Sequence, residues 1–246
     1  MVNEKMAQDL RNLGIQSNDV ILMHSSLSSL GYVEGGADTV IDTLMSVLSE
    51  GTLLIPALSW ELSRMENPVF SVKDTPSCVG TISETFRKRP GVIRSLHPTH
   101  SVCGMGVLAE EILSQHIQTD TPAGPKSPFG LLPKYGGKVL MLGCGLRPNT
   151  SMHAVEELSR PWYLMREEKV TFTLVDSDGN AVKKDYECHN FKGVAQRYDR
   201  LENVMDIPSG KVLNATCHLI DAATMWRVGH QKYLEDENYF TEPRQM

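Results

Sequence analysis

The sequence has no long apolar run and no block of positive charge. Nowhere among its 246 residues do about eighteen apolar residues follow one another, so we expect no membrane-spanning helix. The first residues, Met1 to Leu10, are largely polar and do not form an apolar signal segment. The net charge of −6 and the lack of a Lys/Arg-rich block argue against nucleic acid as a partner. We therefore expect a soluble cytoplasmic protein that binds neither membranes nor nucleic acid.

Cysteine is too scarce and too scattered for a disulfide framework. The five cysteines are odd in number and contain no Cys-x-x-Cys pair, which also argues against a zinc ribbon. Reduced thiols are expected. Cys144 and Cys188, the latter beside His189, could each be a thiol nucleophile, or each could be a buried cysteine that acts as a small apolar residue.

Apolar periodicity predicts an α/β fold. Residues 20–23 and 52–55 are short β-rich runs, and residues 37–48 between them have helical periodicity, which makes a β-α-β unit with parallel strands. A long segment, 57–77, lacks clear periodicity and contains two prolines, so it predicts a loop that covers or shapes a site.

The C-terminal third predicts antiparallel strands. Residues 170–175 and 181–186 flank an Asp178-Gly179 turn, which is a hairpin signal. Helices are expected at 189–199 and 220–234 with a strand at 213–217 between them. We expect one domain over residues 1–246, with a mixed sheet flanked by helices and a β-hairpin in its last third.

The most informative passage is residues 138–157. An apolar strand ends at Gly143-Cys144-Gly145 and leads to a helix that opens at Asn149. Glu156 follows His153 by three residues, so both side chains leave one helix face and the carboxylate can polarise the ring. This arrangement predicts a general base. Alternatively, His153 is a buried histidine that a carboxylate satisfies, or Glu156 pairs with Arg160 on a solvated face.

Two other motifs have both functional and structural interpretations. Residues 24–31 form a serine-rich turn after a strand, whose hydroxyls and N–H groups could hold phosphate or could only cap the next helix. His97 and His100 have a His-x-x-His spacing that, with His153 or Glu156, could bind zinc. Pro98 disfavours a helix there, so a supporting or substrate-contacting role for His97 is the preferred interpretation.

The segments, taken in order, resemble the aminoglycoside 3-N-acetyltransferase family, which uses acetyl-coenzyme A and does not have the GNAT fold. The resemblance covers most of the chain. Its carriers are His24-Ser25-Ser26-Leu27 with Gly31 and Gly35-Gly36, Gly51 to Pro56, Thr75-Pro76-Ser77 with Gly80, Arg94-Ser95 with His97-Pro98 and Ser101, Ser127-Pro128, Gly137 to Gly143, and Asn149 to His153 with Glu156.

The resemblance implies a function for these residues. His153 would be the catalytic base and Glu156 its support, with no metal involved. The turn from Ser25 through Ser26 and Leu27 to Ser28 would hold the coenzyme A pyrophosphate. Three further residues would line the coenzyme channel or brace it, namely Ser77, Arg94 and Ser101.

The acceptor implied by the resemblance is the 3-amino group of a 2-deoxystreptamine antibiotic. Such antibiotics carry several positive charges, so we expect an acidic cleft. The candidate side chains are Asp176, Asp178, Asp185, Glu187, Glu61 and Glu66. Two departures from the family put the acceptor in doubt: a short segment between Pro56 and Thr75, and the weakly matched residues 187–191.

Two other functions stay open. One is a zinc hydrolase that uses His97, His100 and His153. The other is a coenzyme A-binding protein whose acceptor site has decayed.

Overall fold

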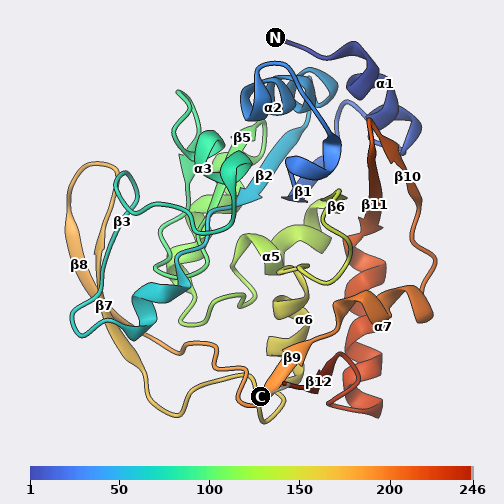
Figure 1. The fold of residues 1–246 in the computed structure, drawn as a ribbon. Helices are drawn as coiled ribbons and strands as arrows, with labels where there is room; N and C mark the ends of the chain where they lie inside the picture. Colours follow the sequence, from blue (N-terminus) through green and yellow to red (C-terminus); the bar gives the residue numbers. More distant parts are fainter. Residues whose placement is uncertain (245–246) are drawn as a thin grey trace.

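The computed structural model describes residues 1–244 and shows a central sheet with helices on both faces (Figure 1). The seven strands lie in the order β10 (Ser209–Val212), β11 (Ala215–Asp221), β6 (Lys138–Leu142), β1 (Val20–Ser25), β2 (Thr52–Pro56), β5 (Val102–Gly106) and β4 (Ile93–Arg94). β1 runs parallel to β2 and to β6, and the outer pairs are antiparallel. The sheet is therefore mixed, as the sequence predicts.

Each central strand contributes to two cores because successive side chains point to opposite faces. In β1, Ile21 and Met23 face one core, and Val20 and Leu22 face the other. The first core is covered by α1 (Glu4–Asn12), α2 (Gly36–Val47) and α3 (Thr81–Arg87). The second is covered by α4 (Ala109–Leu113), α5 (Pro128–Leu131), α6 (Met152–Ser159) and α7 (Ala222–Glu235).

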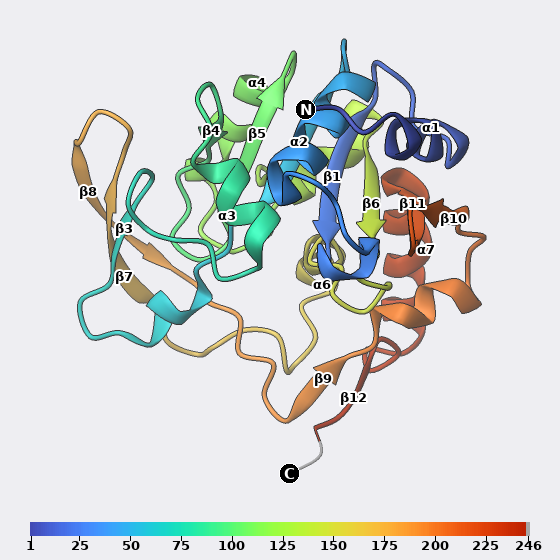
Figure 2. The ribbon, with the colours of Figure 1, turned by 45° about the horizontal axis from the view of Figure 1, so that its top comes forward.

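Polar side chains fix where several helices begin. Asn3 accepts a hydrogen bond from the Met6 amide at the start of α1, and Asp221 accepts one from the Thr224 amide at the start of α7. Figure 2 shows α1 and α7 beside β10 and β11 at one end of the sheet. In the described part of the chain, five 3₁₀ helices connect the elements: η1 (Ser28–Leu30), η2 (Trp60–Arg64), η3 (Ser114–Gln118), η4 (Leu132–Tyr135) and η5 (Tyr198–Asn203).

The predicted hairpin is confirmed and belongs to a second, three-stranded sheet. β7 (Val170–Val175) pairs with β8 (Ala181–Tyr186), and β3 (Val69–Ser71) adds to β7 in parallel. Asp176 accepts hydrogen bonds from the amides of Asp178 and Asn180, both at 2.9 Å, which closes the turn. This sheet projects from the side of the molecule (Figures 1 and 2).

The helix expected at 189–199 is wrong. His189 forms an isolated bridge with Met165, β9 (Val194–Gln196) pairs with β12 (Thr241–Pro243), and η5 begins at Tyr198. Phe191 at φ 49° and Gly193 at φ 71° interrupt any helix here, because left-handed residues end it. Within residues 1–244, no helix combines the length and the apolar content that a membrane span requires.

Candidate functional site

The site lies where β1 and β6 end. These parallel neighbours continue to opposite faces of the sheet, and their carboxyl ends therefore open a crevice of the kind that binds ligands in α/β folds. A pocket of about 610 Å³ occupies this place. Ser25 from the end of β1 and Cys144, Thr150 and His153 from beyond β6 line one part of it.

The loop between β6 and α6 positions His153. Gly143 adopts φ 73°, and a Cβ atom there would lie 2.9 Å from the Cβ of Ala215, so a larger residue would not fit. Asn149 is buried and accepts a hydrogen bond from the Ser151 amide at 3.1 Å. His153 then lies in the first turn of α6, with its backbone bonded to Thr150.

Glu156 is fully buried behind His153. Its Oε2 lies 2.8 Å from His153 Nδ1 and accepts a hydrogen bond from the Tyr198 hydroxyl at 2.6 Å. Its Oε1 accepts hydrogen bonds from Tyr163 at 3.1 Å and Tyr233 at 2.9 Å. The surface pair with Arg160 is not formed, because Arg160 bonds to Glu187 instead.

These partners keep the carboxylate ionised. Burial raises the pKa of Glu156, but the hydrogen bond and the charge of His153 outweigh it and hold the pKa below its usual value. Burial and the Glu156 charge raise the pKa of Tyr198 well above its usual value, so its hydroxyl remains a donor. Since an ionised carboxylate only accepts hydrogen bonds, His153 Nδ1 carries the proton. Nε2 is then the basic nitrogen of the ring that lines the pocket.

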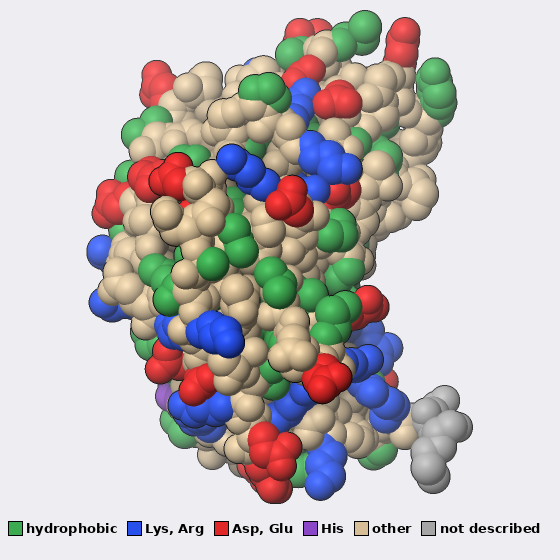
Figure 3. Space-filling model, turned by 90° about the vertical axis from the view of Figure 1, so that its left-hand side faces the viewer, with side chains coloured by type: hydrophobic (Ala, Val, Ile, Leu, Met, Phe, Trp, Pro, Cys, Tyr) green, Lys and Arg blue, Asp and Glu red, His purple; other side chains and the backbone are tan. Residues whose placement is uncertain are grey.

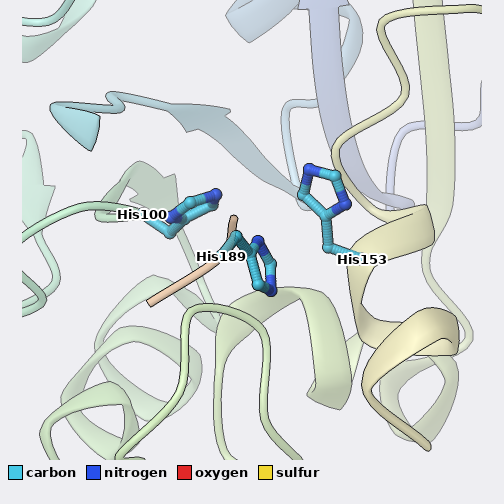
Figure 4. A group of neighbouring side chains, drawn as sticks. All are labelled: His100, His153 and His189. Atoms are coloured by element: carbon cyan, nitrogen blue, oxygen red, sulfur yellow. The ribbon is translucent and has the colours of Figure 1, made fainter. Parts of the chain in front are cut away.

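Two more histidines surround His153 (Figure 4). The ring centroid of His153 lies 4.8 Å from that of His189 and 5.8 Å from that of His100, and His100 and His189 lie 5.1 Å apart. His189 Nε2 lies 2.8 Å from Oε1 of Glu157, and His100 Nδ1 lies 2.9 Å from the Thr99 hydroxyl. All three histidines line the pocket.

His97 is not part of this group. Its ring is buried, stacks on His116 at 4.4 Å, and does not line the pocket. Nδ1 accepts hydrogen bonds from the amides of Thr99 and His100, which holds the turn that carries His100. Of the two roles expected for His97, the supporting one is therefore seen, because His97 braces the turn. Its buried ring outside the pocket gives no support to a substrate contact or to a zinc set with His100 and His153.

The serine turn reaches the pocket at Ser25. The Ser26 hydroxyl lies 2.8 Å from that of Ser29 and 3.3 Å from that of Ser28, and Leu27 precedes η1. The turn therefore presents a cluster of partly exposed hydroxyls beside the end of β1.

Arg94 and Ser101 brace the pocket wall instead of lining it. Arg94 donates to the Ser101 hydroxyl at 2.9 Å and to the Ala57 carbonyl at 2.9 Å, and Ser101 donates to the same carbonyl at 2.7 Å. Ala57 lies between the lining residues Pro56 and Leu58. Because the Arg94 guanidinium already donates to protein acceptors, this geometry does not favour direct contact between Arg94 and coenzyme A.

Ser77 also lies outside the pocket lining. Its hydroxyl lies 2.8 Å from that of Ser83, which lines the pocket and donates to the Pro56 carbonyl at 2.5 Å. Ser77 thus supports this wall through Ser83.

The two thiols that line the pocket are not activated. Burial raises the pKa of Cys144 to about 12 and that of Cys188 to about 11. Neither is therefore a thiolate at neutral pH, and the nucleophile interpretation has no support here.

The pocket is not the acidic cleft that the sequence predicts. Among residues 1–244, no Asp or Glu side chain lines it, whereas four arginines do: Arg64, Arg147, Arg166 and Arg244. Asp176 closes its own hairpin turn, Asp178 is exposed there, and Glu187 pairs with Arg160 and Lys169. Figure 3 shows charges of both signs interspersed on the face that carries the hairpin. None of the six carboxylates expected at the acceptor therefore lines this pocket.

Several site residues have no signal in the sequence. Tyr198 and Tyr233 follow Glu156 by 42 and 77 positions, so only the fold brings them together. Trp60, Ser63 and Arg64 line the pocket, which confirms that the segment after β2 shapes a site.

Comparisons with known proteins agree with this arrangement. The sequence model of the family described as aminoglycoside 3-N-acetyltransferase matches residues 22–234. An aminoglycoside N(3)-acetyltransferase VII from Streptomyces paromomycinus is 34% identical over 63% of this chain and 60% of its own length. The chain thus spans about three fifths of that relative.

Two further relatives are matched over most of their length. A prophage-derived aminoglycoside N(3')-acetyltransferase-like protein, YokD of Bacillus subtilis, is 30% identical over 92% of both chains. Its crystal structure superposes with a TM-score of 0.81 over 96% of this chain and 94% of its own. The structure of AAC-VIa bound to sisomicin gives a TM-score of 0.80 at 25% identity, over 95% of this chain and 97% of its own.

The family match covers most of the chain and includes the His153–Glu156 pair and the serine turn. The chain therefore belongs to the aminoglycoside 3-N-acetyltransferase family.

Proposed function

We propose that this protein transfers an acetyl group from acetyl-coenzyme A directly to an amine, with His153 as general base. The observation that carries the proposal is the 2.8 Å contact between His153 Nδ1 and the buried Glu156 carboxylate, which assigns the ring proton to Nδ1 because an ionised carboxylate only accepts. Glu156 and Tyr198 hold that side of the ring, and Nε2 is left as the basic nitrogen of a residue that lines the pocket. A protonated amine has no lone pair to attack with, so it must lose its proton to such a base.

Glu156 stabilises the imidazolium that forms when the proton is transferred. It is ionised, fully buried and fixed by three tyrosine hydroxyls, so its charge is already oriented before the reaction. The neutral thiols of Cys144 and Cys188 support direct transfer over an acyl-cysteine intermediate.

Thr150 is the candidate donor to the thioester oxygen as it gains charge. It lines the pocket directly before α6, whereas the Ser151 hydroxyl is buried and its amide is bonded to Asn149. We place the coenzyme pyrophosphate at the serine hydroxyls of Ser25, Ser26 and Ser28. The pocket arginines suit phosphate groups because a guanidinium donates two parallel hydrogen bonds.

The names of the relatives support a class of acceptor. We propose the 3-amino group of a 2-deoxystreptamine aminoglycoside, which the names of the relatives support. No carboxylate within residues 1–244 lines the pocket, which favours acceptors of lower positive charge within that class. We also propose that residues 1–246 act as one domain in the cytoplasm.

A panel of amines tests the acceptor. The purified protein is incubated with acetyl-coenzyme A and each aminoglycoside or simple amine, and the release of free thiol is measured. We expect turnover with at least one aminoglycoside and an acetylated product by mass spectrometry. Calorimetric binding of acetyl-coenzyme A with no transfer to any amine would instead support a coenzyme A-binding protein with a decayed acceptor site.

A further inference from the structure

His100, His153 and His189 come from three separate segments and surround one space. His100 precedes β5, His153 lies in the first turn of α6, and His189 lies in the bridge after β8. Figure 4 shows the three rings around a common space. One ring nitrogen of each residue lies within 4.8 Å of those of the other two.

Each ring already has an oxygen partner on one nitrogen. These partners are Glu156 for His153 Nδ1, Glu157 for His189 Nε2 and the Thr99 hydroxyl for His100 Nδ1. Glu157 is itself fixed by the Ala123 amide at 2.7 Å and the Thr121 hydroxyl at 2.5 Å. Histidine ligands of metals almost always donate their other ring N–H to such a group, which raises their basicity.

The second nitrogen of His189 is an orphan. Nδ1 is buried and has no hydrogen-bond partner within residues 1–244, although a buried polar atom is normally satisfied. Because Glu157 fixes the proton on Nε2, Nδ1 presents a lone pair. Nε2 of the buried His97 is unpaired in the same way, but His189 lines the pocket and His97 does not.

We propose that His100, His153 and His189 form a site for a divalent transition-metal ion of the Zn²⁺ class. Three neutral imidazoles are a known ligand set for zinc, with Zn–N distances of about 2.0 to 2.1 Å, and they leave a fourth position for water or ligand. In a tetrahedral site with these bond lengths, the ligand nitrogens lie roughly 3.3 Å apart. The three ring nitrogens lie within 4.8 Å of one another, so they move closer by about an ångström or two when the ion binds. Glu156 and Glu157 lie directly behind two of the ligands and offset the charge of the ion.

Metal binding occupies the nitrogen that the general base needs. If the ion takes Nε2 of His153, no lone pair remains to accept the amine proton, so the occupied site is inactive in acetyl transfer. This consequence rests on the proposed function, whereas metal binding itself does not.

Cobalt tests the site directly. Purified protein is freed of metal with a chelator and titrated with Co²⁺ alone, and the visible absorption of four-coordinate Co²⁺ is recorded. We expect one ion per chain, displaced by Zn²⁺. If titration of the unaltered protein yields no spectrum of four-coordinate Co²⁺, the proposal is overturned. A sulfur-to-cobalt charge-transfer band also overturns it, because that band would assign the ion to Cys144 or Cys188.

Variants assign the ligands. His189→Gln should weaken Co²⁺ binding by more than about 100-fold, and Glu157→Gln by roughly 10- to 100-fold, the usual effect of losing a partner behind a ligand. His218→Gln is the matched control, because His218 lies on β11 outside the cluster. Circular dichroism confirms that each variant is folded. Equal affinity in the His189 and His218 variants contradicts the proposal.

Inhibition is measured separately. Zn²⁺ should suppress thiol release by the unaltered protein, and chelator should restore it. His189→Gln should need at least about tenfold more Zn²⁺ relative to its own metal-free rate. If the protein transfers acetyl to no amine, the proposed function is refuted, and the cobalt titration alone decides whether the metal site exists. If turnover occurs but is insensitive to Zn²⁺, only the inhibition by bound metal is refuted.

Discussion

Replacement of Glu156 by glutamine separates a charged support of His153 from a merely structural one. The carboxylate accepts four hydrogen bonds, from His153 and Tyr198 on one oxygen and from Tyr163 and Tyr233 on the other. Glutamine keeps the shape and one acceptor oxygen. Its amide nitrogen only donates, so two of the four donors must turn away or reverse.

The magnitude follows from the type of bond that is lost. A hydrogen bond to a charged group contributes about 1.5 to 3 kcal/mol and a neutral one about 0.5 to 1.5 kcal/mol. The imidazolium formed in the transition state therefore loses about 1 to 2 kcal/mol, which lowers kcat by roughly 5- to 30-fold. Loss of hydrogen bonds to a buried charged group also lowers the free energy of unfolding, by about 1.5 to 3 kcal/mol.

The assay is thiol release with the best amine of the panel, from pH 5.5 to 9, with urea denaturation and calorimetry of acetyl-coenzyme A on the same protein. We expect kcat to fall across this pH range, because the imidazolium that forms in the transition state loses its counter-charge. Coenzyme affinity should stay unchanged. The matched control is Glu50→Gln, because Glu50 is exposed and does not line the pocket. A folded Glu156→Gln variant with kcat within about twofold of wild type across this pH range refutes the reasoning.

Three further predictions concern the tyrosines, the arginine brace and the buried histidines. Tyr198→Phe should lower kcat about fivefold, because it removes the hydroxyl next to His153 Nδ1. Tyr163→Phe should lower kcat less, because the Tyr163 hydroxyl contacts only Oε1 of Glu156. Equal effects of the two variants in the thiol-release assay would contradict this prediction. Arg94→Lys should lower the free energy of unfolding in urea by about 2 to 4 kcal/mol, because one ammonium group cannot reach both the Ser101 hydroxyl and the Ala57 carbonyl that the guanidinium spans. A loss under about 0.5 kcal/mol would refute the structural role of Arg94 in the pocket wall. Burial lowers the pKa of His24 and of His116 to about 3, so below an unfolded pKa of about 6.5 only the unfolded chain gains these protons and stability falls as the pH falls. At pH 5.5 each should cost about 1.4 kcal/mol relative to neutral pH; urea midpoints that do not change between pH 7.5 and 5.5 would contradict it.

Local patterns in the sequence predict the parts of the fold that short-range geometry decides. The strands β1, β2 and β6, the hairpin and the His153–Glu156 pair all follow from spacings of a few residues. The segment 189–199 fails because its backbone pairs with distant strands, and residues at positive φ break the helical pattern.

Long-range contacts account for what the sequence could not predict. The tyrosines on Glu156, and the neighbours His100 and His189, depend on how separate elements pack, so no local period reveals them. The expected acidic acceptor residues are misplaced for the same reason. Asp176 closes its own hairpin turn, and Glu187 pairs with Arg160 and Lys169 outside the pocket.

The most direct test of the account is acetyl transfer by His153→Asn and His153→Ala. Asparagine places an amide near the position of Nδ1, where it can still donate to Glu156, but it has nothing at Nε2. We expect both variants to fold, to bind acetyl-coenzyme A with wild-type affinity by calorimetry, and to lose roughly 100- to 10,000-fold in kcat, the usual contribution of a general base. Near-normal turnover in either folded variant would contradict the assignment of His153 as the base.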